Sequence, residues 1–268
     1  MMTNPVKEKL RSGQLVFGAW ITTPNPTAVE IMALAGFDFL VIDAEHGAIN
    51  VESVQMMLQA MSATETAPLV RLPGSQRAYA TKILDAGPCG VIVPMVNSRD
   101  EAIAAVQVAR YPPEGTRGIG LGRAHRFDPA IRDEYLKTAN ASMLVGIQIE
   151  HRDAVDRVEE IVTVPGIDLV LLGLADLSGS LGHAGDPEHS EVRIAVEKVV
   201  NTTRKTGVAL GIPVGGAGDI VARVEQGFQF FHLGADMFYL GQACKNRLRE
   251  ARQAVETTST VHQIGRGH

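Results

Sequence analysis

The sequence predicts a single α/β domain, a (β/α)₈ TIM barrel, and three observations support this prediction. Eight short, continuous apolar segments have the composition of strands that are buried on both faces of a parallel sheet. Each is followed by a longer segment with apolar residues at helical spacing. The length of 268 residues is close to the roughly 250 residues of such barrels. With no break in composition, we expect the barrel to span 1–256 and the polar segment 257–268 to form a flexible tail.

The predicted elements alternate along the whole chain. The predicted strands are 15–20, 37–43, 67–71, 90–95, 143–150, 167–173, 208–213 and 230–234. The predicted helices are 28–35, 51–61, 78–86, 99–109, 154–162, 192–206, 219–226 and 242–255. Several helices are followed by glycine, which is favoured at helix C-caps: Gly36, Gly87, Gly207 and Gly227.

The connection between the fourth helix and the fifth strand is longer than an ordinary loop. It covers 111–140, and a connection of this length usually contains structure of its own, so we expect an extra helix near 129–138. Its glycine-rich part, 115–122, lacks the Lys-Ser/Thr pair of a phosphate-binding loop. The glycines are better explained by a tight backbone crossing near Arg117 and Arg123.

Composition excludes several classes of protein. The net charge of −5 gives no electrostatic footprint for nucleic acid. No apolar run approaches the roughly 20 residues of a membrane span, and residues 1–11 lack the apolar core of a signal peptide. The two cysteines, Cys89 and Cys244, fit a reducing compartment. We therefore expect a cytoplasmic protein.

Polar residues gather where the predicted strands end, and in such barrels the carboxyl ends of the strands carry the active site. The second, third, fifth and sixth strands contribute them. These residues are Asp43, Glu45, His46, Arg71, Gln148, Glu150 and Asp176. The barrel would bring these chain-distant side chains to one rim.

Glu150 and Asp176 follow neighbouring strands and are candidate metal ligands. Two carboxylates without a cysteine or histidine partner suit a hard divalent cation such as Mg²⁺ or Mn²⁺. Taken singly, each carboxylate is better explained as the cap of the following helix. The pair at matching strand ends, beside a histidine and an arginine, favours metal binding.

His46 is a candidate general base. It follows Asp43 and Glu45, and a carboxylate near an imidazole fixes its tautomer and stabilises its protonated form. The alternative is a structural loop histidine. His232, inside the eighth predicted strand, is more simply a core residue.

Arg71 ends an apolar strand, where its planar guanidinium can hold a carboxylate or an enolate oxygen. The alternative is a buried ion pair with Asp43 or Asp85. Trp20 either forms a wall of the pocket or belongs to the core. No lysine lies at a predicted strand end, which disfavours imine chemistry.

These motifs resemble the HpcH/HpaI aldolases, metal-dependent (class II) pyruvate aldolases. The resemblance covers most of the chain. It rests on the segments Gly36–His46, Leu69–Arg71, Val93–Val96, Tyr111–Gly118, Gln148–Glu150 and Gly173–Ser178. The Asp-x-Glu-His and Tyr-Pro-Pro-x-Gly-x-Arg-Gly patterns within them are its most specific parts.

The resemblance implies a barrel of the phosphoenolpyruvate/pyruvate type that reversibly cleaves 4-hydroxy-2-oxo acids to pyruvate and an aldehyde. A divalent metal (Mg²⁺, Mn²⁺ or Co²⁺) and an arginine would stabilise the pyruvate enolate. The implied roles are metal binding for Glu150 and Asp176, catalysis for His46 paired with Asp85, and substrate binding for Arg71, Gln148, Gly173, Ala175, Asp176 and Trp20. It also implies a hexamer, a trimer of dimers, with an exchanged C-terminal helix.

The chain departs from the family pattern at Leu174, where proline is common, and at His183, where an aromatic residue is frequent. Leu174 concerns the loop whose backbone N–H groups would hold the substrate carboxylate. Two alternatives stay open: a citrate-lyase-type acyl-CoA lyase, which would need a basic site for the CoA tail, and a metabolite-binding barrel without catalysis.

Overall fold

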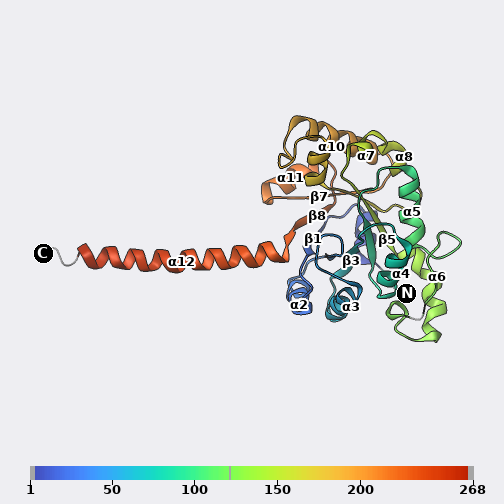
Figure 1. Ribbon diagram of the computed structural model, residues 1–268, viewed down its shortest axis with the longest axis horizontal. Helices are drawn as coiled ribbons and strands as arrows, with labels where there is room; N and C mark the ends of the chain where they lie inside the picture. Colours follow the sequence, from blue (N-terminus) through green and yellow to red (C-terminus); the bar gives the residue numbers. More distant parts are fainter. Residues whose placement is uncertain (1–3, 121, 265–268) are drawn as a thin grey trace.

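The chain folds into a closed barrel of eight parallel strands in the order β1 to β8. This computed structural model describes residues 4–120 and 122–264 (Figure 1). The strands are β1 (Val16–Ile21), β2 (Phe39–Asp43), β3 (Ala67–Arg71), β4 (Gly90–Val93), β5 (Leu144–Ile149), β6 (Leu169–Leu172), β7 (Ala209–Pro213) and β8 (Phe230–Ala235).

Helices surround the barrel. They are α1 (Pro5–Arg11), α2 (Pro26–Leu34), α3 (Val51–Ala60), α4 (Arg77–Asp85), α5 (Arg99–Ala109), α6 (Pro129–Ser142), α7 (Arg152–Asp156), α8 (Val158–Val162), α9 (Leu174–Ser180), α10 (Ser190–Thr203), α11 (Ala217–Glu225) and α12 (Asp236–Ile264). Two short 3₁₀ turns are η1 (Met61–Ala63) and η2 (Arg123–His125). The predicted TIM barrel is confirmed.

The long connection contains the predicted additional helix, α6, together with η2. Its glycines permit a close crossing. A Cβ on Gly120 would lie 2.8 Å from Asp85 Oδ2, and one on Gly115 would lie 2.3 Å from the carbonyl oxygen of Arg110. The glycine-rich segment therefore passes tightly against the ends of α4 and α5, a close crossing as the sequence predicted.

Some predicted bounds are wrong. The predicted helix 154–162 is two helices, α7 and α8, because the backbone of Arg157 between them leaves the helical region at φ −104° and ψ 16°. Helices α1 and α9 were not predicted. The last helix begins at Asp236 and continues to Ile264 rather than covering 242–255. Residues 257–264 of the predicted tail therefore continue α12, and 265–268 lie outside the described residues.

Helix α1 closes the amino end of the barrel. Val6 and Leu10 are buried against the side chains inside the barrel. The ammonium group of Lys7 donates to the carbonyl of Met143 at 2.6 Å and to Asp168 at 2.8 Å. Burial lowers the pKa of Lys7, and the attraction of Asp168 opposes this. This closure leaves the carboxyl end of the strands as the open end.

Helix α12 leaves the barrel after β8 and projects away from it (Figure 1). Several of its large apolar side chains are exposed, and the most exposed are Phe238, Leu240 and Val255. Among the described residues, no helix is long and apolar enough to cross a membrane.

Candidate active site

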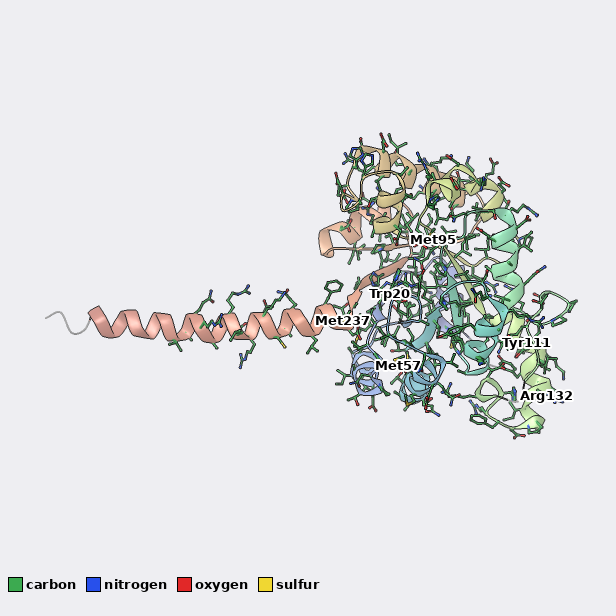
Figure 2. The ribbon with its side chains drawn as sticks, viewed as in Figure 1. Trp20, Met57, Met95, Tyr111, Arg132 and Met237 are labelled. Atoms are coloured by element: carbon green, nitrogen blue, oxygen red, sulfur yellow. The ribbon has the colours of Figure 1, made fainter. Side chains whose placement is uncertain are left out.

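A cavity of about 270 Å³ lies at the carboxyl end of the strands. Most of the predicted site residues line it: Trp20, Asp43, Arg71, Gln148, Glu150, Gly173, Ala175 and Asp176. They come from β1, β2, β3 and β5 and from the connection after β6. Figure 2 marks Trp20 on the side of the barrel from which α12 departs, near Met237. The structure thus brings together residues spread over more than half of the chain.

Arg71 is held by the neighbouring strand. Asp43 and Arg71 are register partners at the ends of β2 and β3. The Arg71 guanidinium donates to both Asp43 oxygens, from Nε at 3.0 Å and from Nη2 at 2.5 Å. The predicted alternative of an ion pair with Asp43 is therefore confirmed. This bidentate pairing fixes the plane of the guanidinium.

The remaining edge of Arg71 faces the cavity residues. Its Nη1 donates to Gln148 Oε1 at 3.3 Å and lies 3.2 Å from Glu45 Oε2. The guanidinium also stacks over the Trp20 ring, 4.3 Å from its centre. Trp20 thus serves both as a wall of the cavity and as a cation–π partner that orients the arginine.

Glu150 is almost completely buried, with 2% of its surface exposed. Its Oε1 accepts a hydrogen bond from the backbone N–H of Met95 at 2.7 Å, and its Oε2 accepts one from Gln148 at 2.9 Å. Met95 has a positive φ of 52°, a strained conformation for a residue with a side chain. The backbone after β4 thus turns its N–H group onto this carboxylate.

The carboxylates of Glu45, Glu150 and Asp176 gather beside the guanidinium of Arg71, which is already paired with Asp43. Burial raises the pKa of Glu150 to about 7, and Glu45 and Asp176 raise it further, although the Met95 N–H and Arg71 oppose this. Burial also raises the pKa of Glu45, against the attraction of Arg71. Among the described residues, Glu45 Oε2 has no hydrogen-bond partner although it is buried.

This donor set fits a hard divalent cation. A cation between Glu150 and Asp176 would compensate the charge of the buried Glu150 carboxylate and its repulsion by Asp176, and oxygen donors are the ligands that Mg²⁺ and Mn²⁺ prefer. Asp176 is exposed toward the open side, which leaves positions for water or substrate oxygens.

Gly173 allows this close approach. A Cβ at position 173 would lie only 2.3 Å from Glu150 Oε2. We therefore expect Gly173→Ala to push Glu150 aside and weaken divalent-cation binding about tenfold or more, while the fold survives. Calorimetric titration with Mn²⁺ measures this affinity. Gly179→Ala is the control, since a Cβ at Gly179 meets nothing within 4 Å; equal affinities in the two variants would contradict the expectation.

His46 lies on the rim, outside the residues that line the cavity. Its side chain is 64% exposed, and its Nε2 lies 3.9 Å from Glu45 Oε2. Its backbone N–H and that of Glu45 donate to Asp43 Oδ1 at 3.2 and 3.1 Å. Asp43 therefore shapes the loop that carries both residues, in addition to holding Arg71.

Within one chain, the structure does not bring Asp85 and His46 together. Asp85 is the last residue of α4, at the amino end of the barrel, whereas His46 follows the carboxyl end of β2. Asp85 lies 3.8 Å from Arg117 Nη2. Burial raises the pKa of Asp85, and Arg117 and His125 oppose this.

His232 lines the cavity, which the sequence interpretation missed. Its ring lies edge-on to Trp20, with ring centres 5.3 Å apart. Burial lowers its pKa to about 3, with Arg71 adding to the effect and Asp43 opposing it, so the ring is neutral. Its Nε2 is buried without a hydrogen bond from any described residue. Alternation along β8 could have indicated an inward side chain, but not the unpaired nitrogen.

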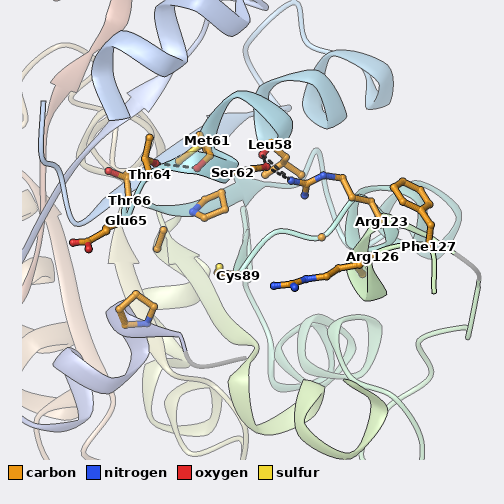
Figure 3. Close-up of a pocket in the computed structure, with 15 residues that line it drawn as sticks. Leu58, Met61, Ser62, Thr64, Glu65, Thr66, Cys89, Arg123, Arg126 and Phe127 are labelled. Atoms are coloured by element: carbon orange, nitrogen blue, oxygen red, sulfur yellow. Dashed lines mark hydrogen bonds between the residues drawn. The ribbon is translucent and has the colours of Figure 1, made fainter. Parts of the chain in front are cut away.

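A larger cavity, of about 570 Å³, lies near the start of β3 (Figure 3). Its Arg123 is bound to the protein itself, with bonds to the carbonyls of Ala86 and Leu58 and to the hydroxyl of Ser62. None of the predicted site residues lines this cavity. The predicted site residues therefore gather at the smaller cavity, at the carboxyl end of the strands.

Comparison with known proteins agrees with this geometry. A family described as HpcH/HpaI aldolase/citrate lyase matches residues 16–243. A 4-hydroxy-2-oxo-heptane-1,7-dioate aldolase of Escherichia coli is 38% identical over 91% of this chain and 93% of its own. A hydroxypyruvate/pyruvate aldolase of Paraburkholderia phytofirmans is 35% identical over 93% of this chain and 98% of its own.

Solved structures show the same fold. A crystal structure of an HpcH/HpaI aldolase/citrate lyase family protein from Burkholderia cenocepacia has a TM-score of 0.89 and 35% identity, and covers 93% of this chain and 100% of its own. A citrate synthase has a TM-score of 0.86 and 30% identity, over 95% and 100% of the two chains. A citrate lyase from Burkholderia xenovorans is only 15% identical, so that likeness shows the fold alone.

Proposed function

The chain belongs to the HpcH/HpaI aldolase/citrate lyase family, and on that premise we propose that it reversibly cleaves 4-hydroxy-2-oxo acids to pyruvate and an aldehyde. It is a carbon–carbon lyase, as its aldolase relatives over most of the chain show. The observation that carries the proposal is the buried Arg71 guanidinium beside the carboxylates of Glu150 and Asp176 in one cavity.

The family implies a divalent metal, and the donor set suits Mg²⁺, Mn²⁺ or Co²⁺. Glu150 and Asp176 would hold it, and Gln148 would orient Glu150 through its hydrogen bond of 2.9 Å. When bound, the metal supplies Lewis-acid stabilisation of negative charge on the oxo acid.

Arg71 binds the carbonyl oxygen of the oxo acid. This oxygen becomes negative as the bond between C3 and C4 breaks, so a guanidinium already fixed by Asp43 and Trp20 stabilises the charge without reorganisation. The cavity of about 270 Å³ is at the small end of ligand sites, which suits a compact substrate.

The substrate carboxylate would lie at the start of α9. Leu174 and Ala175 are in the first turn of this helix, where backbone N–H groups have no partner within the helix. Leu174 replaces the proline common in the family, yet α9 begins at Leu174 itself. The helical turn thus forms without that proline.

His46 is proposed to move the proton between substrate and solvent, directly or through water. We expect His46→Ala to slow the exchange of pyruvate methyl protons in D₂O, and cleavage with it, by roughly 10²–10⁴-fold. Metal affinity should hardly change. The exchange is followed by NMR of the pyruvate methyl group.

A second outcome would assign His46 differently. If His46→Ala loses the metal and regains full exchange at saturating Mn²⁺, His46 is a ligand or scaffold residue, and Glu45 becomes the next candidate for the base. Asp85→Asn should give a milder form of the His46→Ala defect only if Asp85 reaches His46 from another copy of the chain, because the two are at opposite ends of one barrel.

We propose that copies of the chain assemble through α12, in a hexamer built as a trimer of dimers. Phe238 is 74% and Leu240 69% exposed on this projecting helix, and large exposed apolar surfaces mark interfaces. Phe238 also lines the cavity. An exchange of α12 between copies would therefore put the interface between them next to the cavity. Sedimentation should show an oligomer, and Phe238→Asp should shift it toward smaller species; a monomeric native protein would contradict the proposal.

A further inference from the structure

A cluster of histidine and glutamate side chains lies outside the cavity, on the connection between α9 and α10. His183 belongs to the loop after α9, His189 caps the amino end of α10, and Glu191 is in its first turn. One potential ligand atom from each of the three lies within 4.8 Å of the others. The aldolase proposal uses none of these side chains.

The contacts within the cluster orient the donor atoms. His183 Nε2 lies 3.0 Å from Glu191 Oε2. The rings of His183 and His189 are stacked, with centres 3.4 Å apart and planes inclined by 18°. His189 Nδ1 accepts the backbone N–H of Glu191 at 3.3 Å, which occupies one ring nitrogen and leaves Nε2 to bind a ligand.

We propose that His183, His189 and Glu191 form a second metal site, selective for zinc, with solvent in the fourth position. Two imidazoles and one carboxylate are a common ligand set for Zn²⁺, with metal–nitrogen distances of about 2.0–2.1 Å. Donor atoms within 4.8 Å of one another are close enough for one ion to bridge, provided that the stacked imidazole rings turn so that the metal lies in the plane of each.

This ligand set differs in kind from that of the cavity. Glu150 and Asp176 offer oxygen only, which suits Mg²⁺ and Mn²⁺, whereas imidazole nitrogen favours zinc and its neighbours in the first transition row. The two sites share no residue. One chain can therefore hold a hard cation in the cavity and zinc on the connection.

A metal at the proposed site would stabilise the loop between α9 and α10. The backbone N–H of His183 donates to the carbonyl of Ser178 at 2.8 Å, and Ser178 is fully buried in α9. A metal bound by His183, by the cap residue His189 and by Glu191 would link the loop after α9 to the start of α10. Zinc would thus stabilise the end of α9, the helix that carries Asp176.

The experiment measures Zn²⁺ stoichiometry by equilibrium dialysis of the full-length protein against Zn²⁺ buffered by a chelator, with metal content determined by mass spectrometry. It compares the wild type with His183→Ala and His189→Asn. Asparagine is a good helix cap, so His189→Asn removes the ligand while retaining the start of α10. His151→Ala is the matched control, since His151 caps α7 through a bond from the N–H of Asp153.

We expect each cluster variant to bind one Zn²⁺ fewer per chain than the wild type, with at least about a hundredfold weaker binding at the affected site, and His151→Ala to bind as the wild type does. With Cu²⁺ as a probe, paramagnetic resonance should show two nitrogen ligands that fall to one in each variant. Unchanged Zn²⁺ stoichiometry and affinity in both variants would overturn the proposal and leave His189 as a helix cap only.

Thermal unfolding in a Glu150→Gln background separates this site from the cavity. Zn²⁺ at about a hundredfold excess over its Kd should raise Tm by roughly 5–10 °C, and Mg²⁺ should not. Adding His183→Ala should remove the shift. A shift that persists without His183 would contradict the proposal.

Discussion

Glu150→Gln is expected to lower the cleavage of 4-hydroxy-2-oxo acids by at least about a thousandfold, because it removes an anionic metal ligand from the centre of the cavity. Glutamine keeps the shape of the side chain, and its carbonyl oxygen can still accept the bond from the Met95 N–H at 2.7 Å, although its NH₂ group cannot accept the bond that Gln148 donates at 2.9 Å. The main loss should be that of the anionic ligand. Initial rates of pyruvate release at saturating Mn²⁺ measure it.

Glu101→Gln is the matched control for this change. Glu101 also accepts a backbone N–H from the segment after β4, that of Asn97 at 2.6 Å, but it does not line the cavity. Its replacement should leave the rate within about twofold. A Glu150→Gln enzyme that kept its activity would exclude Glu150 as a required ligand.

The same replacement has a second consequence, in the metal-free protein. In the folded protein the pKa of Glu150 is raised from 4.5 to about 7. The protonated carboxyl therefore contributes fully to the free energy of unfolding below pH 4.5, and this contribution is lost as the pH rises through 7. At about 1.4 kcal/mol per pKa unit, the loss is about 3 kcal/mol. Metal-free Glu150→Gln should thus be more stable than the wild type at pH 8 and similar at pH 4.5, as denaturant unfolding would show.

Arg71→Lys is expected to lower cleavage by about 10²–10³-fold, in the range seen when one stabilising donor is lost. Lysine keeps the charge, but it cannot hold both oxygens of Asp43, at 3.0 and 2.5 Å, and also reach Gln148. The positive charge would then no longer be fixed where the carbonyl oxygen lies. The methyl exchange of pyruvate in D₂O measures this defect without an aldehyde.

Arg110→Lys is the control for a lost buried guanidinium. Arg110 is as buried as Arg71, at 8% exposure, and donates to the carbonyls of Asn140 and Gly166. Its replacement should lower stability while leaving exchange per folded enzyme close to normal. If Arg71→Lys exchanged pyruvate protons as fast as Arg110→Lys does, the role assigned to Arg71 would be wrong.

The positions that the sequence predicted well are those that depend only on where a strand ends. Arg71 and Glu150 end or follow buried strands, and parallel strands all end at the same face. His232 was missed because it lies within β8, where it was taken for a core residue, and no local pattern shows that its Nε2 lacks a partner.

Contacts between distant segments were harder to predict. The resemblance pairs Asp85 with His46 but does not say whether both residues come from the same chain. Within one chain, Asp85 and His46 lie at opposite ends of the barrel. Helix α9 was missed because Ser-Gly-Ser at its end is a poor helix former; the burial of Leu177 and Ser178 holds it in place. Helix α1 had readable signals in Asn4 and Pro5.

The most direct test of the central claim is the release of pyruvate from a panel of 4-hydroxy-2-oxo acids, measured before and after treatment with EDTA and again after metal is restored. At least one acid should yield pyruvate and an aldehyde in equal amounts. EDTA should abolish the reaction, and Mn²⁺, Mg²⁺ or Co²⁺ should restore it. Cleavage that continues at full rate in metal-free protein would contradict the account, as would the absence of pyruvate from every acid tested with metal present.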